Sequence, residues 1–298
     1  MNANSHHYSK WQIWLLAARP KTLWAGITPV IMGGAIALDA SQLHIAALCA
    51  ALAGSVFIQI GTNLANDLFD YLKDTDRQDR IGPMRVTQAG LVSPKQMKWA
   101  TVFVFGLAVL IGFYLVFRGG MPILIIGTLS ILFGILYTAG PYPLGYTGWA
   151  DLFVIVFFGP VAVAGTYYVN ALTVTPEVIL AGIPAGMIST AILTVNNLRD
   201  FKTDTRAGKR TLVVRFGKKF ARMEYLFLLL GALCFPIFFS IFSSDHFWVL
   251  ISLFSAFIMI PSIKKVLQIE GPELNQVLAQ TGKALAIFGI LFSIGWNL

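Results

Sequence analysis

Long apolar stretches recur along the chain and alternate with short polar segments. A membrane-spanning helix needs about 20 predominantly apolar residues, because each residue rises about 1.5 Å and the hydrocarbon core is about 30 Å thick. Nine stretches meet this requirement, over residues 20–38, 43–67, 97–117, 121–138, 149–169, 177–198, 220–242, 246–262 and 281–297. We therefore predict an all-α membrane protein in which residues 1–298 form a single polytopic domain.

The polar segments between these stretches alternate in charge. When the N-terminal segment is placed inside, the inner segments hold 21 of the 22 Lys and Arg residues, and Arg118 is the exception. Cytoplasmic loops of membrane proteins carry such an excess of positive charge. One missed or additional helix would invert the pattern downstream and destroy the asymmetry. The charges therefore support the nine spans and a cytoplasmic N-terminus.

The composition agrees with a membrane protein and narrows its possible partners. Hydrophobic residues make up 56% of the chain and charged residues only 12%, whereas a soluble domain has about 25% charged residues. The net charge of +8 comes from the basic inner loops, so we expect contact with the lipid bilayer and no nucleic acid. Cys49 and Cys234 fall inside predicted helices, which argues against a disulfide or a cysteine-based metal site.

Two short segments at the inner ends of predicted helices hold seven of the fourteen acidic residues. One segment follows the second helix and the other follows the sixth, so both emerge on the same face of the membrane. Side chains three or four positions apart share one face of a helix. This spacing predicts one polar stripe of Asn63, Asp67, Asp70 and Asp74, and a second stripe of Asn196 or Asn197, Asp200 and Asp204.

The two stripes are predicted to bind divalent cations. Each lies at a helix C-terminus, where the dipole disfavours negative charge, and neighbouring carboxylates also repel each other. Because the stripes contain oxygen ligands and no His or Cys, we expect Mg²⁺, which takes one or two carboxylates and completes its shell with water and phosphate. The predicted metal ligands are Asp67, Asp70, Asp74, Asp76, Asp200 and Asp204.

Polar and aromatic residues near the stripes are candidate substrate contacts. A diphosphate held by the metal ions would accept hydrogen bonds from amide and basic side chains, namely Asn63, Asn66, Lys73, Arg85, Asn197, Arg206 and Lys209. The uncharged inner loop after the fourth helix holds three tyrosines, Tyr137, Tyr142 and Tyr146, which either border an aromatic substrate or form an interfacial belt. Arg19 either guides an anionic substrate or anchors the first helix. The acidic and basic residues of these inner loops are also compatible with an ordinary solvent-exposed surface that binds no substrate.

With these motifs laid out, the chain resembles the UbiA superfamily of intramembrane aromatic prenyltransferases. The first stripe contains the pattern Asn66-Asp67-x-x-Asp70-x-x-x-Asp74, and the second contains Asp200-x-x-x-Asp204, as in the two Asp-rich motifs of that superfamily. The resemblance covers essentially the whole chain. It implies nine transmembrane helices around a central cavity, with cytoplasmic cap loops.

Shorter strings resemble one subfamily, which prenylates 1,4-dihydroxy-2-naphthoate. They are Arg19-Pro-Lys-Thr-Leu, Asn63-Leu-Ala-Asn-Asp, Asp79-Arg-Ile-Gly-Pro, the Tyr137–Tyr146 loop, Asn196-Asn-Leu-Arg-Asp and Gly208-Lys-Arg-Thr-Leu. One departure is Asp74, where that subfamily often has Gly and an acid two residues later, which matches Asp76. Asp74 and Asp76 therefore compete for one place at the metal.

The resemblance also implies a reaction and a location. A polyprenyl chain would pass from polyprenyl diphosphate to 1,4-dihydroxy-2-naphthoate with release of CO₂ and diphosphate, which gives demethylmenaquinone in menaquinone biosynthesis. Mg²⁺ would be the cofactor, and the catalytic residues would be Asp67, Asp70, Asp200, Asp204 and Tyr137. The enzyme would lie in a bacterial cytoplasmic (inner) membrane, with its site open to the cytoplasm.

Two other functions fit part of this pattern. A related prenyltransferase that acts on 4-hydroxybenzoate or another aromatic acceptor would have nearly the same site. A transporter of a divalent cation or a phosphate compound would also need acids inside the membrane. Its site would lie nearer the bilayer midplane, whereas the acids here cluster at the cytoplasmic ends of helices and basic residues follow them. This placement favours an enzyme.

Overall fold

The computed structural model describes residues 8–73, 81–243 and 245–298, and its named elements are helices. In chain order they are α1 (Lys10–Ala18), α2 (Pro20–Asp39), α3 (Ile45–Leu72), α4 (Pro94–Gly119), α5 (Met121–Leu136), η1 (Leu144–Tyr146), α6 (Trp149–Val156), η2 (Phe157–Val161), α7 (Ala162–Ala171), α8 (Pro176–Arg199), α9 (Phe201–Arg206), α10 (Leu212–Phe242), η3 (Phe247–Ser255), α11 (Ala256–Gln268), η4 (Gly271–Glu273) and α12 (Leu274–Trp296).

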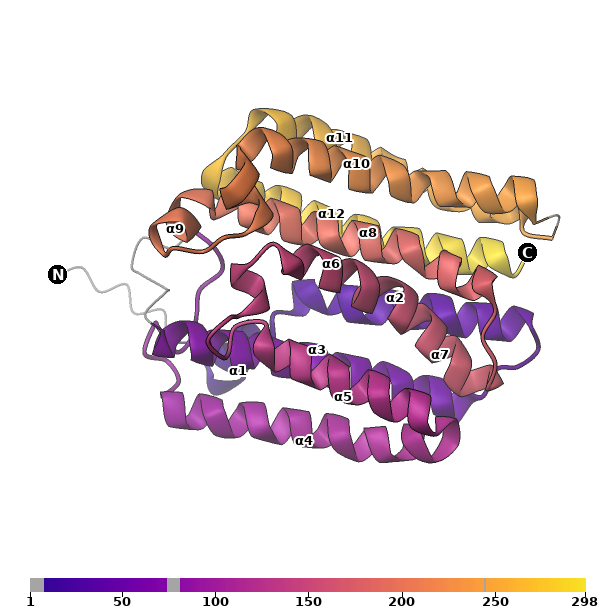
Figure 1. Ribbon diagram of the computed structural model, residues 1–298, viewed down its shortest axis with the longest axis horizontal. Coiled ribbons are helices and arrows are strands. Elements are labelled where there is room, and N and C mark those ends of the chain that lie inside the picture. The colour runs from indigo at the N-terminus through magenta and orange to yellow at the C-terminus, as the bar shows by residue number, and fades with distance from the viewer. Residues whose placement is uncertain (1–7, 74–80, 244) are drawn as a thin grey trace.

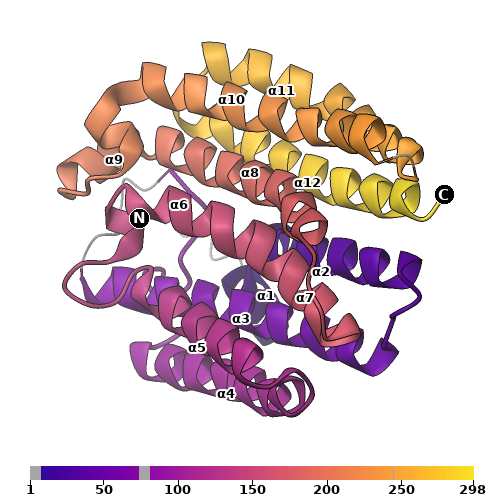
Figure 2. The same cartoon turned by 45° about the vertical axis from the view of Figure 1, so that its right-hand side comes forward.

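The predicted all-α membrane fold is confirmed. Within the described ranges, eight helical segments are long and apolar enough to cross a membrane, and α5 is a shorter apolar helix. Each of the nine predicted spans therefore has a helical counterpart. The axes of the long helices are roughly aligned, and the helices end at two opposite faces of the bundle (Figures 1 and 2). Together these helices make the chain a multi-pass membrane protein.

The bundle has a densely packed side and a more open side. The largest cluster of buried side chains joins α2, α7, α8, α10 and α12, and it includes Met32, Ile188, Tyr225 and Phe288. Helices α3, α4 and α5 lie on the other side of the bundle (Figure 1). A smaller cluster around Leu64 and Leu68 of α3 holds the segment that follows this helix. The two sides leave room between them for the cavity described below.

A kink at η2 shapes the wall between the two sides. Gly159 has non-helical backbone angles (φ −119°, ψ −107°), and the next residue, Pro160, cannot donate a helical hydrogen bond. The end of α6 and the kinked segment lie against the backbone of α8, because a Cβ atom at Gly186 would lie 2.2 Å from the carbonyl oxygen of Ile155 and 3.1 Å from the Cα atom of Gly159. Glycine at this position therefore permits the close helix packing.

Several helix boundaries differ from the sequence prediction, and three of these differences have a local cause. A capping box between Ser9 and Gln12 starts a separate helix, α1, before the first span. Helix α5 ends at Leu136, so its 16 residues extend over about 24 Å, which is less than the roughly 30 Å thickness of a hydrocarbon core. Helix α12 begins at Leu274, before the predicted start at residue 281, because the buried residues Leu274 and Val277 continue its apolar face.

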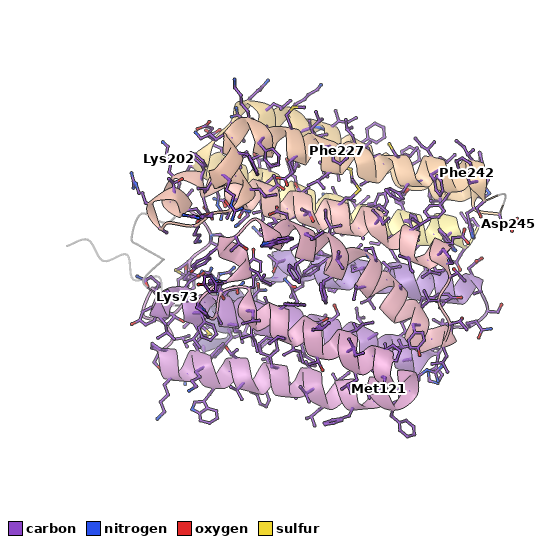
Figure 3. All side chains as sticks on the ribbon, viewed as in Figure 1. Lys73, Met121, Lys202, Phe227, Phe242 and Asp245 are labelled. Carbon is purple, nitrogen blue, oxygen red and sulfur yellow. The ribbon has the colours of Figure 1, made fainter. Side chains whose placement is uncertain are left out.

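The two ends of the bundle differ in charge. Lys73 and Lys202 lie at the end where α9 is found, and Met121 lies at the opposite end (Figure 3). Arg118, the exception to the charge pattern, donates from Nε to the Val169 carbonyl oxygen at 2.5 Å and from a terminal nitrogen to the Asn170 carbonyl oxygen at 2.9 Å. The Arg118 guanidinium therefore caps the C-terminal end of α7, which explains a basic residue at the end of the bundle opposite the basic loops.

Candidate active site

A cavity of about 1310 Å³ lies between the two sides of the bundle. Its charged residues come from the end where α3 and α8 finish, and its deeper walls are mostly apolar. Most of the predicted site residues line it, namely Arg19, Asn63, Asn66, Asp70, Lys73, Arg85, Tyr137, Tyr146, Asn197, Asp200, Asp204, Arg206 and Lys209. The two acidic segments therefore meet at one cavity. The predicted ligands Asp74 and Asp76 lie outside the described residues.

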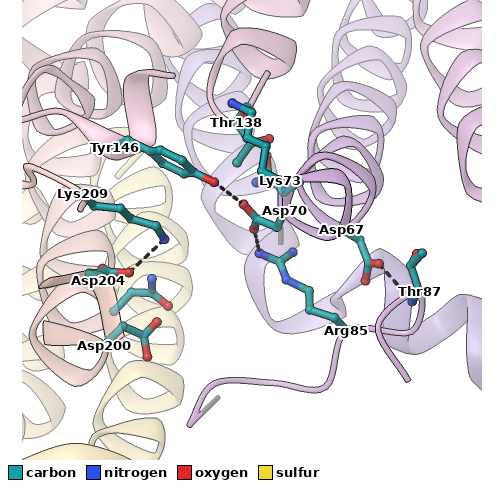
Figure 4. A network of polar contacts seen from close by, with 12 residues as sticks. Asp67, Asp70, Lys73, Arg85, Thr87, Thr138, Tyr146, Asp200, Asp204 and Lys209 are labelled. Atoms are coloured by element: carbon teal, nitrogen blue, oxygen red, sulfur yellow. Dashed lines mark hydrogen bonds and ion pairs between the residues drawn. The ribbon is translucent and has the colours of Figure 1, made fainter. Parts of the chain in front are cut away.

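Asp70 is a centre of contacts on the α3 side. One carboxylate oxygen forms an ion pair with Arg85, and both side chains are buried. The other oxygen accepts a hydrogen bond of 3.0 Å from the Tyr146 hydroxyl (Figure 4). A buried carboxylate is stable only when such partners compensate its lost hydration. Arg85 and Tyr146 supply this compensation from two different loops.

Tyr146 also connects the two acidic segments. Two ammonium groups lie over its ring, with Lys73 Nζ 5.1 Å and Lys209 Nζ 4.8 Å from the ring centroid. Lys209 Nζ forms an ion pair of 2.8 Å with Asp204, the second acid of the α8–α9 segment. Burial works against the charge of Lys209, but Asp204 and its neighbours outweigh burial and raise the lysine pKa. Lys209 therefore stays cationic beside the cavity.

Arg199 lines the cavity but is not among the site residues predicted from the sequence. It is buried, and two of its nitrogens donate to the two carboxylate oxygens of Asp200, at 2.8 and 2.6 Å. Further N–H groups donate to the side-chain oxygens of Asn196 and Asn275, both at 2.8 Å. The only sequence signal for this arrangement was the spacing of Asn196 and Arg199, which places them on one helix face. Asn275 lies far away in the chain, so sequence spacing gave no signal for it.

The two asparagines of α3 support the cavity wall. Asn63 Nδ2 donates to the Ala18 carbonyl oxygen at 2.9 Å and to the Thr22 hydroxyl at 3.0 Å, which ties α3 to the junction of α1 and α2. Asn66 Oδ1 accepts a hydrogen bond of 2.8 Å from the Thr138 hydroxyl. Both residues line the cavity, as expected, while these hydrogen bonds hold the neighbouring segments in place.

Asp67 has a different position from the one its stripe predicts. Its carboxylate is 2% exposed and does not line the cavity. The two oxygens accept hydrogen bonds from the backbone N–H groups of Val86 at 3.0 Å and Thr87 at 3.1 Å (Figure 4). Each helical residue turns by about 100°, so Asn66 and Asp70 share the cavity face and Asp67 points to its flank. This arrangement does not favour Asp67 as a metal ligand.

The tyrosines of the loop after α5 separate into two groups. Tyr137 lines the cavity, whereas Tyr142 is 87% exposed and does not. Burial raises the pKa of Tyr137, and nearby carboxylates, first that of Asp151, add to this effect. Its phenol is therefore neutral at physiological pH. A bond of 2.8 Å from the Gly145 N–H to the Tyr137 carbonyl oxygen folds the loop back toward the cavity.

The acids and amides at the cavity mouth fit a magnesium site. Among the residues that the structure describes, no three His, Cys, Asp or Glu side chains gather as a ready metal cluster. Asp70, Asp200 and Asp204 instead offer separate carboxylates near amide oxygens, which suits an ion that takes one or two carboxylates and keeps water or phosphate in its shell. Each of these carboxylates already has a basic neighbour in Arg85, Arg199 or Lys209.

Comparison with protein families and characterised proteins identifies similar sequences. The model of the UbiA prenyltransferase family matches residues 27–293. The 1,4-dihydroxy-2-naphthoate octaprenyltransferase of Escherichia coli (strain K12) is 36% identical over 294 residues, which cover 96% of each chain. The protein of the same name from Mycobacterium tuberculosis is 37% identical over 281 residues, which cover 93% of this chain and 94% of that one.

Solved structures share the fold at lower sequence identity. A UbiA homologue from Archaeoglobus fulgidus, bound to DMAPP and Mg²⁺, superposes with a TM-score of 0.64 at 16% identity and covers 96% of this chain and 99% of its own. The apo structure of a UbiA homologue from Aeropyrum pernix K1 gives a TM-score of 0.70 at 14% identity, with 92% and 97% of the two chains covered. These similarities support the same helical architecture.

Proposed function

Because the chain belongs to the UbiA prenyltransferase family, we propose that it transfers a polyprenyl group from polyprenyl diphosphate to 1,4-dihydroxy-2-naphthoate. The observation that carries this proposal is the division of the cavity into a polar mouth and an apolar chamber. Carboxylates, amides and basic groups surround its mouth, and an apolar chamber lies beyond them. Such a cavity matches a substrate with an anionic head and a long hydrocarbon tail. The names of the similar bacterial proteins supply the acceptor.

The reaction breaks two bonds, the allylic C–O bond and the bond between the ring and its carboxylate carbon, and it forms one C–C bond. The electron pair of the broken ring–carboxylate bond stays with the ring. The allylic C–O bond of the prenyl diphosphate ionises, and its electron pair leaves with the diphosphate. A ring carbon of the naphthoate then bonds to the allylic carbon, and the carboxylate carbon leaves as CO₂. The product is a prenylated naphthalenediol, the reduced form of demethylmenaquinone. Stabilising the negative charge that develops on the diphosphate is the main electrostatic task of the site.

Basic residues around the cavity mouth are placed for this task. Arg85, Lys209 and Arg206 line the mouth from the loops after α3 and α8. Charge-assisted hydrogen bonds from such groups to phosphate oxygens are roughly twice as strong as neutral ones. Asp70, Asp200 and Asp204 would hold Mg²⁺, which would supply further positive charge opposite the diphosphate. The predicted metal ligands Asp74 and Asp76 remain candidates for the same site, and the geometry supports Asp67 least as a ligand.

The apolar chamber protects the allylic cation. Water would quench this cation, so the prenyl tail and the cavity walls must exclude it. Phe133, Phe153 and Phe157 pack against one another beside the cavity, with ring centroids 4.5 to 6.1 Å apart. Their π faces, and that of Tyr137 nearer the mouth, are suited to stabilise positive charge. Tyr137 and Tyr146 remain candidates for contact with the acceptor ring, whereas the exposed position of Tyr142 gives it less support.

The same proposal gives an orientation in the membrane. The cavity mouth lies at the end that carries the basic loops, including Lys73 and Lys202 (Figure 3). The excess of positive charge would place this end on the cytoplasmic side of a bacterial inner membrane. The site would then open to the cytoplasm, where a water-soluble naphthoate can enter.

An acceptor assay tests the proposal. Purified protein in detergent is incubated with Mg²⁺, a labelled polyprenyl diphosphate and either 1,4-dihydroxy-2-naphthoate or 4-hydroxybenzoate. We expect prenylated product and CO₂ from the naphthoate alone. Product from 4-hydroxybenzoate alone would overturn the proposed acceptor and keep the reaction class. No product from either acceptor, with a folded protein, would reject the proposal and favour the transporter alternative.

A further inference from the structure

The segment that follows the first acidic region crosses the cavity mouth and is fastened on both sides. Its residues Pro83 and Arg85 line the cavity. On one side, Asp67 accepts the backbone N–H groups of Val86 and Thr87, as described above. Val86 is fully buried in the cluster that includes α3 residues. The orientation of Arg85 therefore depends on how the segment is held, because Arg85 precedes this anchor directly.

On the other side, the segment is fastened to the last helix. Asn275, in the first turn of α12, donates from Nδ2 to the Ile81 carbonyl oxygen at 3.2 Å. Its side-chain oxygen accepts a hydrogen bond of 2.8 Å from Arg199. Arg199 in turn holds both carboxylate oxygens of Asp200. One amide thus contacts the supports of both acidic regions without lining the cavity itself.

The chemistry of this contact explains why an asparagine suits the position. Arginine offers only N–H donors and a backbone carbonyl offers only an acceptor. A side chain that joins them must accept on one atom and donate on another, which the amide of Asn275 does. Aspartate would keep the contact with Arg199, lose the bond to Ile81 and compete with Asp200 for the guanidinium. Alanine would remove both bonds.

We propose that Asn275 is a positioning residue for the diphosphate site: it orients the Arg199–Asp200 pair and fixes the segment that presents Arg85 to Asp70. The proposal rests on the proposed prenyl transfer and deepens it, because it assigns to α12 a part in binding the diphosphate head. Removal of Asn275 is expected to loosen both walls of the cavity mouth together. Residues that orient the ligands of a metal site typically change its affinity by roughly 10- to 100-fold when replaced.

The experiment compares Asn275→Ala and Asn275→Asp with Gln276→Ala. Gln276 is the exposed neighbour on the same helix turn, and its amide oxygen accepts a surface hydrogen bond of 3.3 Å from Lys265. For each variant we would measure KM for the polyprenyl diphosphate, the Mg²⁺ requirement and KM for the naphthoate. We expect both Asn275 variants to raise the first two by roughly tenfold or more, with KM for the naphthoate nearly unchanged. The Gln276 variant should match the wild type.

A second measurement does not depend on turnover. Amide hydrogen exchange of residues 84–87 is followed in metal-free, substrate-free protein, where Asn275→Ala should speed exchange and Gln276→Ala should not. Binding of farnesyl thiolodiphosphate with Mg²⁺ should weaken in parallel. If the wild type fails to prenylate any acceptor, the proposed function is rejected. The exchange and binding data then still decide whether Asn275 acts as a positioning residue.

Three results would overturn the proposal. The first is unchanged exchange and unchanged diphosphate affinity in Asn275→Ala. The second is faster exchange with normal diphosphate affinity, which would make the contact structural only. The third is an equal rise in KM for both substrates, which would indicate general loosening of the bundle. If Asn275→Ala does not fold, Asn275→Asp carries the same comparison, because it keeps the contact with Arg199.

Discussion

At the scale of single residues, Asp70 and Asp67 lie three positions apart and face different surroundings. Asp70 faces the cavity and pairs with Arg85 and Tyr146, whereas Asp67 holds the backbone of the following segment. Removing one partner of a buried ion pair costs about 3–5 kcal/mol, because the other charge is left uncompensated. We therefore expect Asp70→Asn to lower the melting temperature. Because the variant also removes a carboxylate proposed to hold Mg²⁺, which supplies several kcal/mol of charge stabilisation in the transition state, kcat/KM should fall by roughly a thousandfold or more.

Asp67→Asn is the matched comparison for that variant. Its amide retains one acceptor oxygen and loses one of the two backbone bonds, which costs about 1–3 kcal/mol. We expect a lower melting temperature and a loss of activity near tenfold, measured with the same labelled-diphosphate assay. Complete loss of turnover in a folded Asp67→Asn protein would restore the predicted role of Asp67 as a metal ligand.

Tyr137 gives a prediction about pH. Burial and nearby carboxylates raise its pKa above the ordinary value, so the hydroxyl keeps its proton through the alkaline range in which a free tyrosine would begin to ionise. The effect of Tyr137→Phe on kcat/KM should therefore be the same factor at pH 7 and at about pH 10.5, where a free tyrosine would be mostly ionised. An effect that disappears toward that pH would show that the phenol ionises like a free tyrosine.

At the scale of helices, small residues determine how much room the prenyl tail has. Gly165 of α7 lines the cavity, and a Cβ atom placed there would meet only Ile126 Cδ1, at 3.8 Å. A larger side chain would extend into the apolar chamber without a backbone clash. We expect Gly165→Leu to favour shorter prenyl diphosphates, seen as a change in relative kcat/KM across a series of chain lengths.

The control for this variant is Gly106→Leu on α4. Gly106 is exposed on the outer surface of the bundle and does not line the cavity, and a Cβ atom there meets nothing within 4 Å. Its chain-length preference should equal that of the wild type. If both variants shift the preference equally, the change reflects helix propensity rather than filled space.

At the scale of the whole molecule, the site is charge-compensated before a metal is added. Arg85, Arg199 and Lys209 each pair with one of the cavity carboxylates. Chelation of divalent cations by EDTA should therefore abolish turnover and leave the melting temperature close to that of the untreated protein. Re-addition of Mg²⁺ should restore activity. Unfolding on chelation would show that the metal, rather than these pairs, holds the two acidic segments together.

The pattern of apolar residues and charges was enough to determine the all-α fold, the nine spans and the gathering of both acidic segments at one end. These features follow from local physics, because the length of an apolar stretch fixes whether it can span a bilayer and the spans then fix which loops share a face. The same reasoning correctly grouped Asp70, Asp200 and Asp204 at one cavity.

Only the tertiary structure decided which neighbouring residues turn into that cavity and what supports them. The side-chain stripe placed Asp67 beside Asp70, but the packing of the segment around Val86 turned Asp67 toward backbone N–H groups. The contact of Asn275 with Ile81 joins residues 194 positions apart, which no local spacing reveals. Such contacts depend on how distant helices pack, so they appear only when the whole chain is folded.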